Sequence, residues 1–436
     1  MKTHSTALIA GLATVAPLIA GPELHTFKKQ QLSDQFWAEG ATFLDVNKDG
    51  KKDVLAGPYW YEAPDFTAKH EIYPATATFD RKKPDGTLEK VPGFEGALGT
   101  ANKYSDNFFT FPQDFNGDGF DDLLVIGFPG QWTAWFENPK GAKDKPWAKH
   151  IALRITDNES PTFADINGDK RPDLVCCSEG RYGYATYDPA NAAAVWTWHP
   201  ISPNKGYQRF THGMGVGDVN GDGRADLLEK DGWWEQPAAL TGDPEWTFHG
   251  YAFNNGGAQM YAYDVNGDGL NDVITSQAAH GYGLAWFEQK KDANGPTFER
   301  HLFMNEKPEE NRYGVRFGEL HALDLVDVDG DGLKDIVTGK RFWSHGTAGD
   351  TKSETRSPLY WFRLVRNPDK SVDYVPNLID GDSGVGVQIV ASLDWNGDSL
   401  ADIAVSNKLG TFVFTHEKKA VTQDEWNKAQ PKITAK

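Results

Sequence analysis

The chain has 436 residues, a formal net charge of −18 at pH 7 and two cysteines. So acidic a chain is unsuited to binding nucleic acid or an anionic membrane surface, because both are negatively charged themselves. The 45 Gly and 24 Pro predict many turns and few long helices. Hydrophobic residues make up 39% of the chain, so a large core can form.

The N-terminal residues predict an export signal. A basic start precedes an apolar run from Thr6 to Ala20, which is too short and too interrupted by Pro to span a membrane. We therefore predict a signal peptide over residues 1–20, a secreted or periplasmic protein, and no membrane span. The adjacent Cys176 and Cys177 are interpreted as small strand residues, with a vicinal disulfide as the alternative.

One nine-residue pattern, D-x-[ND]-x-D-x-x-x-D, occurs seven times. Oxygen side chains at alternating positions of a tight turn are typical of calcium loops, and a Gly at position 6 allows the positive φ of the turn. The predicted calcium ligands are Asp45, Asn47, Asp49 and Asp53; Asp114, Asn116, Asp118 and Asp122; Asp165, Asn167, Asp169 and Asp173; Asp218, Asn220, Asp222 and Asp226; Asp264, Asn266, Asp268 and Asp272; Asp327, Asp329, Asp331 and Asp335; and Asp394, Asn396, Asp398 and Asp402. The alternative is that these residues only form good turns. Lys170 and Ser399 replace the Gly in the third and seventh loops, which argues against calcium there.

Each copy of the pattern has the same neighbours. One apolar strand leads into the loop and another leaves it, an aromatic strand follows, and a fourth strand centres on a His. Four short strands per repeat are typical of a β-propeller blade. The last copy, Val385 to Glu417, lacks the fourth strand, and the stretch ELHTFKK from Glu23 supplies one. We predict an all-β fold: a seven-bladed propeller over residues 21–417, closed by the N-terminal strand, with a polar tail over 418–436.

The loops and their flanking strands resemble the FG-GAP or VCBS repeats of integrin-like propellers over nearly the whole chain after the signal. This resemblance implies the propeller fold and structural calcium, but no single function, since such propellers serve adhesion, scaffolding and catalysis. The stretch THGMGVGDVNGDG, followed by GWWEQP, also resembles the propeller part of fungal aldos-2-ulose dehydratases. That resemblance implies elimination of water from a keto-sugar. The chain lacks the cupin domains of those enzymes, so only part of their chemistry carries over.

Most of the 12 histidines have a place in the repeat. Those at the fourth-strand position are interpreted as structural: His25, His70, His150, His199, His249 and His301. Four have no such place: His212, His280, His321 and His345. All four fall where strands begin or end on the face opposite the calcium loops, so we predict a shared site there. The alternative is four unrelated solvated histidines.

Residues at equal distances from each loop are expected to form rings at this face. The first ring, six residues before the loops, contains Glu39, Phe108, Glu159, His212, Ala258, His321 and Gln388. The residues that follow the second strands include Lys340, Arg341 and Lys408. One reading is a transition-metal site of His212 and His321 with a third His or Glu159. The other is a His base, with Lys340, Arg341 or Arg209 stabilising an enolate. The candidate catalytic residues are His212, His321, His280, Lys340, Glu159 and Arg209. Tyr59, Trp60, Tyr182, Tyr282 and Trp343 are candidates for stacking on a sugar.

The sequence therefore predicts an exported, calcium-stabilised propeller that binds a carbohydrate or other small molecule at the face opposite the loops. Its expected cofactors are calcium and an additional divalent metal at the histidines. The expected chemistry is that of a sugar dehydratase or lyase. The alternative is a non-catalytic propeller that binds a glycan or a protein in adhesion. No nucleotide-binding or serine-hydrolase motif occurs in its required context. The substrate and the oligomeric state stay open.

Overall fold

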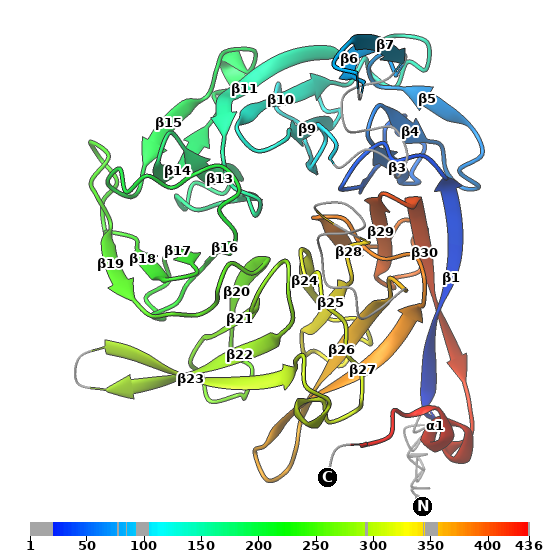
Figure 1. The fold of residues 1–436 in the computed structure, drawn as a ribbon, viewed down its shortest axis with the longest axis vertical. Helices are drawn as coiled ribbons and strands as arrows, with labels where there is room; N and C mark the ends of the chain where they lie inside the picture. The colour runs from blue at the N-terminus through cyan, green and yellow to red at the C-terminus, as the bar shows by residue number, and fades with distance from the viewer. Residues whose placement is uncertain are drawn as a thin grey trace, which may run out of the picture.

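A computed structural model describes residues 21–75, 78–83, 85–92, 104–292, 295–342, 344 and 356–434. Within these ranges the protein is almost entirely β, and its small sheets stand around a common centre in a propeller-like arrangement (Figure 1). The exceptions are two short 3-10 turns, η1 (Pro189–Asn191) and η2 (Pro308–Glu310), and one helix, α1 (Gln423–Ala429). No helix in the described part of the chain is both long and apolar enough to cross a membrane.

Five sheets of the described chain have four strands each. The first contains β2 (Thr42–Leu44), β3 (Asp53–Ala56), β4 (Tyr59–Tyr61) and β5 (Lys69–Glu71). The second contains β8 (Phe109–Gln113), β9 (Asp122–Ile126), β10 (Gln131–Glu137) and β11 (Ala148–Thr156). The third contains β12 (Thr162–Ala164), β13 (Asp173–Ser178), β14 (Arg181–Thr186) and β15 (Thr197–Pro200). The fourth contains β24 (Leu323–Val326), β25 (Asp335–Gly339), β26 (Leu359–Arg366) and β27 (Val372–Asp380). The fifth contains β28 (Ile389–Leu393), β29 (Asp402–Asn407), β30 (Gly410–Ala420) and β1 (Glu23–Ser33).

A further sheet has eight strands, in the order β19-β18-β17-β16-β20-β21-β22-β23. Its first half contains β16 (Met214–Gly217), β17 (Asp226–Glu229), β18 (Gly232–Glu235) and β19 (Thr247–Gly250). Its second half contains β20 (Gln259–Tyr263), β21 (Asp272–Ser276), β22 (Leu284–Asp292) and β23 (Gly295–Met304). The halves are joined by parallel pairing of β16 with β20. The insertion before β8 contributes a two-stranded hairpin of β6 (Thr78–Lys82) and β7 (Leu88–Pro92).

The two ends of the chain lie in one sheet. β1 runs antiparallel to β30, from the pair Glu23 and Ala420 to the pair Ser33 and Thr411 (Figure 1). β30 thus continues past Glu417, the predicted end of the propeller, and α1 lies within the predicted polar tail over 418–436. The capping box of Thr422 and Glu425 begins this helix, because each side chain accepts a hydrogen bond from the other residue's backbone N–H.

The core lies between neighbouring sheets. One cluster packs Val175 and Tyr184 of the third sheet against Leu227 and Trp234 of the eight-stranded sheet. The second strand of each unit is buried along its length, as in the run from Asp173 to Ser178. Burial on both faces explains why these strands are continuously apolar or small, and it places the adjacent thiols Cys176 and Cys177 in the core.

The fourth-strand histidines make a repeated contact that fits the structural role predicted for them. The His70 ring lies 4.3 Å from the Trp60 ring, and its Nε2 lies 3.1 Å from Oε2 of Glu62. The same Trp, His and Glu combination recurs at His150, His249 and His301. His199 differs, since it stacks on Tyr184 and contacts Asp243. Each contact ties the third strand of a unit to its outermost strand.

Candidate functional site

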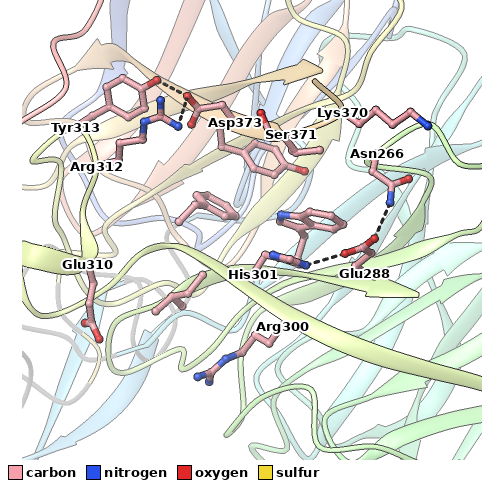
Figure 2. A pocket seen from close by; sticks show the side chains of 15 residues that line it. Asn266, Glu288, Arg300, His301, Glu310, Arg312, Tyr313, Lys370, Ser371 and Asp373 are labelled. Carbon is pink, nitrogen blue, oxygen red and sulfur yellow. Dashed lines mark hydrogen bonds and ion pairs between the residues drawn. The ribbon is translucent and has the colours of Figure 1, made fainter. Parts of the chain in front are cut away.

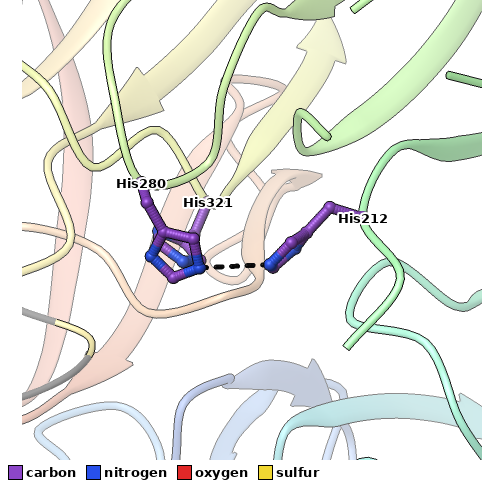
Figure 3. Close-up of side chains that lie close together, drawn as sticks. All are labelled: His212, His280 and His321. Carbon is purple, nitrogen blue, oxygen red and sulfur yellow. Dashed lines mark hydrogen bonds between the residues drawn. The ribbon is translucent and has the colours of Figure 1, made fainter. Parts of the chain in front are cut away.

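Three histidines from neighbouring strand ends lie close together (Figure 3). His212 lies just before β16, His280 just after β21 and His321 just before β24. These strand ends lie away from the calcium-type loops, since each loop joins the opposite ends of the first and second strands. Nε2 of His212 is 3.2 Å from Nε2 of His280, and one nitrogen from each ring lies within 4.8 Å of the others. The three side chains that we expected to share a site therefore lie together.

The depth of the three rings is unequal. The side chains of His280 and His212 are 36% and 13% exposed, whereas His321 is buried. The site therefore extends from the surface at His280 to the interior at His321. Nearly all of the ring of residues six positions before the loops is buried as well, including Glu39 and Gln388. Inward-pointing side chains thus fill the axis at this level.

Two buried carboxylates flank the histidines. Oε2 of Glu159 lies 4.0 Å from Nε2 of His212. Oε2 of Glu319 lies 3.8 Å from Nδ1 of both His280 and His321. Glu319 is fully buried and has a φ of 57°, a left-handed conformation that is uncommon for a residue other than Gly. The site therefore combines imidazoles with acidic groups, a donor set that suits a divalent cation.

A serine connects Glu319 to the histidines. Oγ of Ser344 lies 3.0 Å from Oε2 of Glu319, 3.1 Å from Nε2 of His321 and 3.3 Å from Nη1 of Arg341. Neither Glu319 nor Ser344 was among the candidate site residues. Glu319 stands at a repeat position, two residues outside the predicted ring and equivalent to Asp106 and Asp157, whereas Ser344 begins an insertion and no repeat position identified it.

A fully buried ionic cluster lies beside the histidines and joins three sheets. Arg341, which follows β25, donates Nη2 and Nε hydrogen bonds to the Glu39 carboxylate at 2.6 and 3.1 Å. Nζ of Lys408, which follows β29, donates to the same carboxylate at 2.9 Å. Arg341 also approaches Glu159, with 4.0 Å between Nη1 and Oε2. The cluster connects the first sheet to those that contain β25 and β29.

These surroundings decide the charge of the groups. Burial, followed by the charge of Arg341 and the other two histidines, holds the pKa of His321 well below its usual value. His321 is therefore neutral at physiological pH, as a metal ligand must be. Burial alone would raise the pKa of Glu39, but Arg341 and Lys408 outweigh it and keep that pKa below the usual range.

The other candidate cations lie elsewhere in the site or outside it. Nζ of the buried Lys340 donates to the carbonyl oxygen of Phe342 at 3.3 Å, and Arg341 is the residue whose charge acts on His321. Arg209 packs against Gly130 and acts electrostatically on Asp157. Arg341, one of the three cations considered for stabilising an enolate, thus contacts Ser344 and acts on the charge of His321.

Two of the aromatic residues expected to stack on a sugar are buried, and two are not. Trp60 and Tyr182 are buried in the core, while Tyr59 and Tyr282 are partly exposed. Trp343 and the fourth histidine without a repeat position, His345, lie outside the described residues. Tyr182 packs on Tyr207, so burial between sheets explains its ring.

The seven acidic loops share one turn. In the fourth loop, Gly223 and Asp222 donate backbone N–H bonds to the Asp218 carboxylate, at 2.9 and 3.1 Å. The third loop forms the same bond from Lys170 to Asp165 at 2.8 Å, with Lys170 at a φ of 71°. The replacement of Gly in the third and seventh loops therefore leaves the turn intact. In the sixth loop, carboxylate oxygens of Asp327, Asp329 and Asp335 lie within 4.8 Å of one another.

The aspartate at position 9 of each loop also has a role in the backbone. The two carboxylate oxygens of Asp53 accept N–H bonds from Val46 in the loop and from Ala63 after β4, at 3.0 and 2.8 Å. The same pair of bonds recurs at Asp122, Asp226, Asp272, Asp335 and Asp402. Burial raises the pKa of Asp53 to about 7 despite these bonds. A nearby cation would offset the free-energy cost of keeping this buried carboxylate ionised.

A separate cavity of about 550 Å³ lies at the outer edge of the ring, between β23 and β27 (Figure 2). Arg300, Arg312 and Lys370 approach it, together with Glu288 and Asp373. Arg312 is paired with Asp373 at 3.1 Å. None of the three clustered histidines lines this cavity, so it is distinct from the axial site.

Comparison with known families and proteins identifies the repeat. The model of the FG-GAP-like repeat matches residues 114–176 and 165–229. Integrin alpha pat-2 of Caenorhabditis elegans is 23% identical over 386 residues, which are 74% of this chain and 29% of that protein. The T-cell immunomodulatory protein homolog of Plasmodium falciparum is 25% identical over 217 residues, which are 43% of this chain and 28% of that protein. The chain thus spans less than a third of the length of either relative.

Among solved structures, the V. cholerae biofilm matrix protein Bap1 is similar with a TM-score of 0.32 and 19% identity, over 63% of this chain and 40% of that one. A likeness of this size identifies neither a fold nor a function. The resemblance to aldos-2-ulose dehydratases stays a prediction. The repeat match, the integrin alpha relative and the sheets around a common centre together support an FG-GAP β-propeller.

Proposed function

We propose that this protein binds an oxygen-rich ligand, such as a carbohydrate, through a divalent metal ion at the axial histidines. The observation that carries the proposal is the approach of one nitrogen from each of His212, His280 and His321 to within 4.8 Å of the others. Three imidazoles and an open position are typical of metal sites that accept an external oxygen ligand. Nδ1 of His321 supports this fit, since it is buried and has no hydrogen-bond partner among the described residues.

The fold that we propose for this role is a closed ring of seven blades. Five four-stranded sheets and the two halves of the eight-stranded sheet would each be a blade, and each half carries one acidic loop. The pairing of β1 with β30 supports closure by the N-terminal strand, because it covers an edge that would otherwise be open. Glu39, Arg341 and Lys408 support it too, since they bridge sheets from both ends of the chain.

We further propose that the loops bind calcium and that residues 1–20 direct export. The alternating oxygen side chains and the raised pKa of buried Asp53 support calcium. The apolar N-terminal run supports export, and extracellular calcium would keep the loops occupied. Calcium here is structural and distinct from the metal at the histidines.

Binding without catalysis is the first candidate function, and the integrin alpha relative favours it. A second candidate is elimination of water from a keto-sugar, which the placement of Glu159 and Arg341 around His212 favours. A metal ion, when bound, would polarise the sugar carbonyl. Glu159 would take the proton from the carbon beside that carbonyl, Arg341 would stabilise the enolate, and the same proton would pass from Glu159 to the hydroxyl on the next carbon, which would leave as water.

Metal analysis of the purified protein, followed by Co²⁺ titration of apoprotein, tests the site. We expect one transition-metal ion in addition to calcium, and none in His212→Ala. His70→Ala, which removes a fourth-strand histidine, is the matched control and should bind the ion normally. Wild-type protein that takes up no transition metal would exclude the proposed site.

Glycan binding and keto-sugar turnover then separate the two candidate functions. Metal-dependent glycan binding without product supports the binding protein. Formation of an unsaturated ketone, followed by its ultraviolet absorbance, supports the lyase, and that activity should vanish in both His212→Ala and Glu159→Gln. Turnover that is unaffected by Glu159→Gln would contradict the role given to Glu159.

A further inference from the structure

Among the described residues, the hydroxyl of Ser344 has three polar neighbours that bear on where its proton lies. Glu319, at 3.0 Å, is a buried carboxylate and can only accept a hydrogen bond when ionised. Arg341, at 3.3 Å, can only donate. Nε2 of His321, at 3.1 Å, can do either, depending on its tautomer. A serine hydroxyl offers one proton and two lone pairs.

One arrangement satisfies all three contacts. The Ser344 proton goes to Glu319, and the two lone pairs accept N–H groups from Arg341 and from Nε2 of His321. If Nε2 of His321 carried no proton, Ser344 would have to donate to both Glu319 and His321 with its single hydrogen. His321 must therefore carry its proton on Nε2 and a lone pair on Nδ1, which is the nitrogen without a hydrogen-bond partner among the described residues.

We propose that Glu319 and Ser344 are positioning residues that hold His321 in this tautomer, with Nδ1 as its metal-ligating atom. The inference rests on the proposed metal site. Outer carboxylates that fix the tautomer of a ligating histidine are a general feature of metal centres. Here the Glu319 carboxylate acts through the Ser344 hydroxyl, which also accepts a hydrogen bond from Arg341.

The backbone of Glu319 supports the assignment independently. Its φ of 57° places a large side chain in a region that Gly occupies without cost. Such strain persists where the surroundings fix a residue for a purpose. The same carboxylate oxygen that approaches Ser344 also lies 3.8 Å from Nδ1 of His280, so one strained residue faces two of the three histidines.

The experiment has two independent readouts. The first is ¹⁵N NMR of protein labelled at histidine, in the metal-free state, with His321→Gln to identify the signal. We expect Nε2 of His321 to be protonated in wild type, and this preference to be lost in Ser344→Ala and kept in Ser344→Thr, which retains the hydroxyl. Protonation at Nδ1 in wild type would overturn the inference whether or not the protein binds metal.

The second readout is Co²⁺ affinity and its visible spectrum. We expect Ser344→Ala to weaken Co²⁺ binding about 10- to 100-fold, and Ser344→Thr to restore most of it. The matched control is Ser202→Ala, which removes a buried, hydrogen-bonded hydroxyl from another sheet and should leave the affinity unchanged. If wild type binds no Co²⁺, the proposed function fails. If wild type binds and Ser344→Ala binds equally well with the same spectrum, only the positioning role fails.

Discussion

At the scale of single residues, the three clustered histidines differ in burial, and burial decides what their removal costs. His212 has a partly exposed side chain, while His321 is enclosed beside Ser344 and Arg341. Burial and the contact with Ser344 make His321 part of the packed interior.

We predict that His212→Ala changes the melting temperature by a few degrees at most, whereas His321→Ala lowers stability by about 2–4 kcal/mol, because it opens a cavity and removes a partner of Ser344. Urea denaturation of the metal-free proteins measures both. Equal losses of unfolding free energy in the two variants would contradict the difference in burial between His212 and His321.

The acidic loops give a second prediction at this scale. Lys170 and Ser399 adopt φ values of 71° and 67° at the position where the other loops have Gly. Because a side chain is strained there, Lys170→Gly should raise stability by about 1 kcal/mol. Lys51→Gly, at a loop position without a positive φ, is the control and should lower it. Urea midpoints compare the variants, and no gain for Lys170→Gly would count against strain in the third loop.

At the scale of elements, the contact of β1 with β30 contains a pair of histidines. Nδ1 of His25 lies 2.9 Å from Nε2 of His416, whose ring is buried against Phe27. Burial, then His25 and Lys418, lowers the pKa of His416 from 6.5 to about 4, against a small opposing effect of Asp398. Burial and Lys418 also lower the pKa of His25, which Glu23 partly opposes.

Acid should therefore weaken this contact. The unfolded chain binds protons at His416 more readily than the folded one, so the stability that the neutral pair contributes is present above about pH 6.5 and is lost as the pH falls toward about 4. We expect His416→Gln to flatten the dependence of the melting temperature on pH over this window. His199→Gln, on the partly buried β15 of the third sheet, is the control. If the melting temperature of His416→Gln depends on pH as steeply as that of wild type, protonation of His416 is not what weakens this contact.

The strand β1 itself gives a further prediction. Removal of Glu23 to Lys29 should expose the edge of β30 and cause aggregation or loss of cooperative unfolding. Light scattering and calorimetry measure these effects. A truncated protein that stays monomeric and equally stable would show that β1 is not needed to close the ring.

The seam between β16 and β20 depends on close approach of two backbones. A Cβ added to Gly215 would lie 1.8 Å from the carbonyl oxygen of Met260. Gly215→Ala should therefore force the strands apart and cost about 1–3 kcal/mol. Gly381→Ala, where the nearest neighbouring atom is 4.0 Å away, should cost much less. Similar losses at the two positions, measured in urea, would contradict a tight seam.

At the scale of the whole molecule, stability is distributed over seven loops that share one turn. If each loop binds calcium in the folded state alone, chelation should lower the melting temperature, and added calcium should restore it. Asp222→Ala should cost more stability than Asp169→Ala, because Lys170 replaces the loop Gly beside Asp169 and argues against calcium in the third loop; an Arg pairs with both aspartates, Arg224 with Asp222 and Arg171 with Asp169. A melting curve that excess chelator leaves unchanged would exclude structural calcium.

The sequence by itself determined the repeat and the placement of residues that the repeat imposes. Seven copies of one short pattern predicted the all-β fold, the loop positions and the strand ends at which His212, His280 and His321 meet. It could do so because residues at the same position within each copy of a repeat occupy equivalent places in the folded units. Only the tertiary structure showed that His321 is buried, that the charge of Arg341 acts on it, and which residues Glu319 and Ser344 contact. Those features depend on which side chains cross the axis between distant sheets, and on a backbone turn at Glu319, and neither can be deduced from the spacing of the repeat.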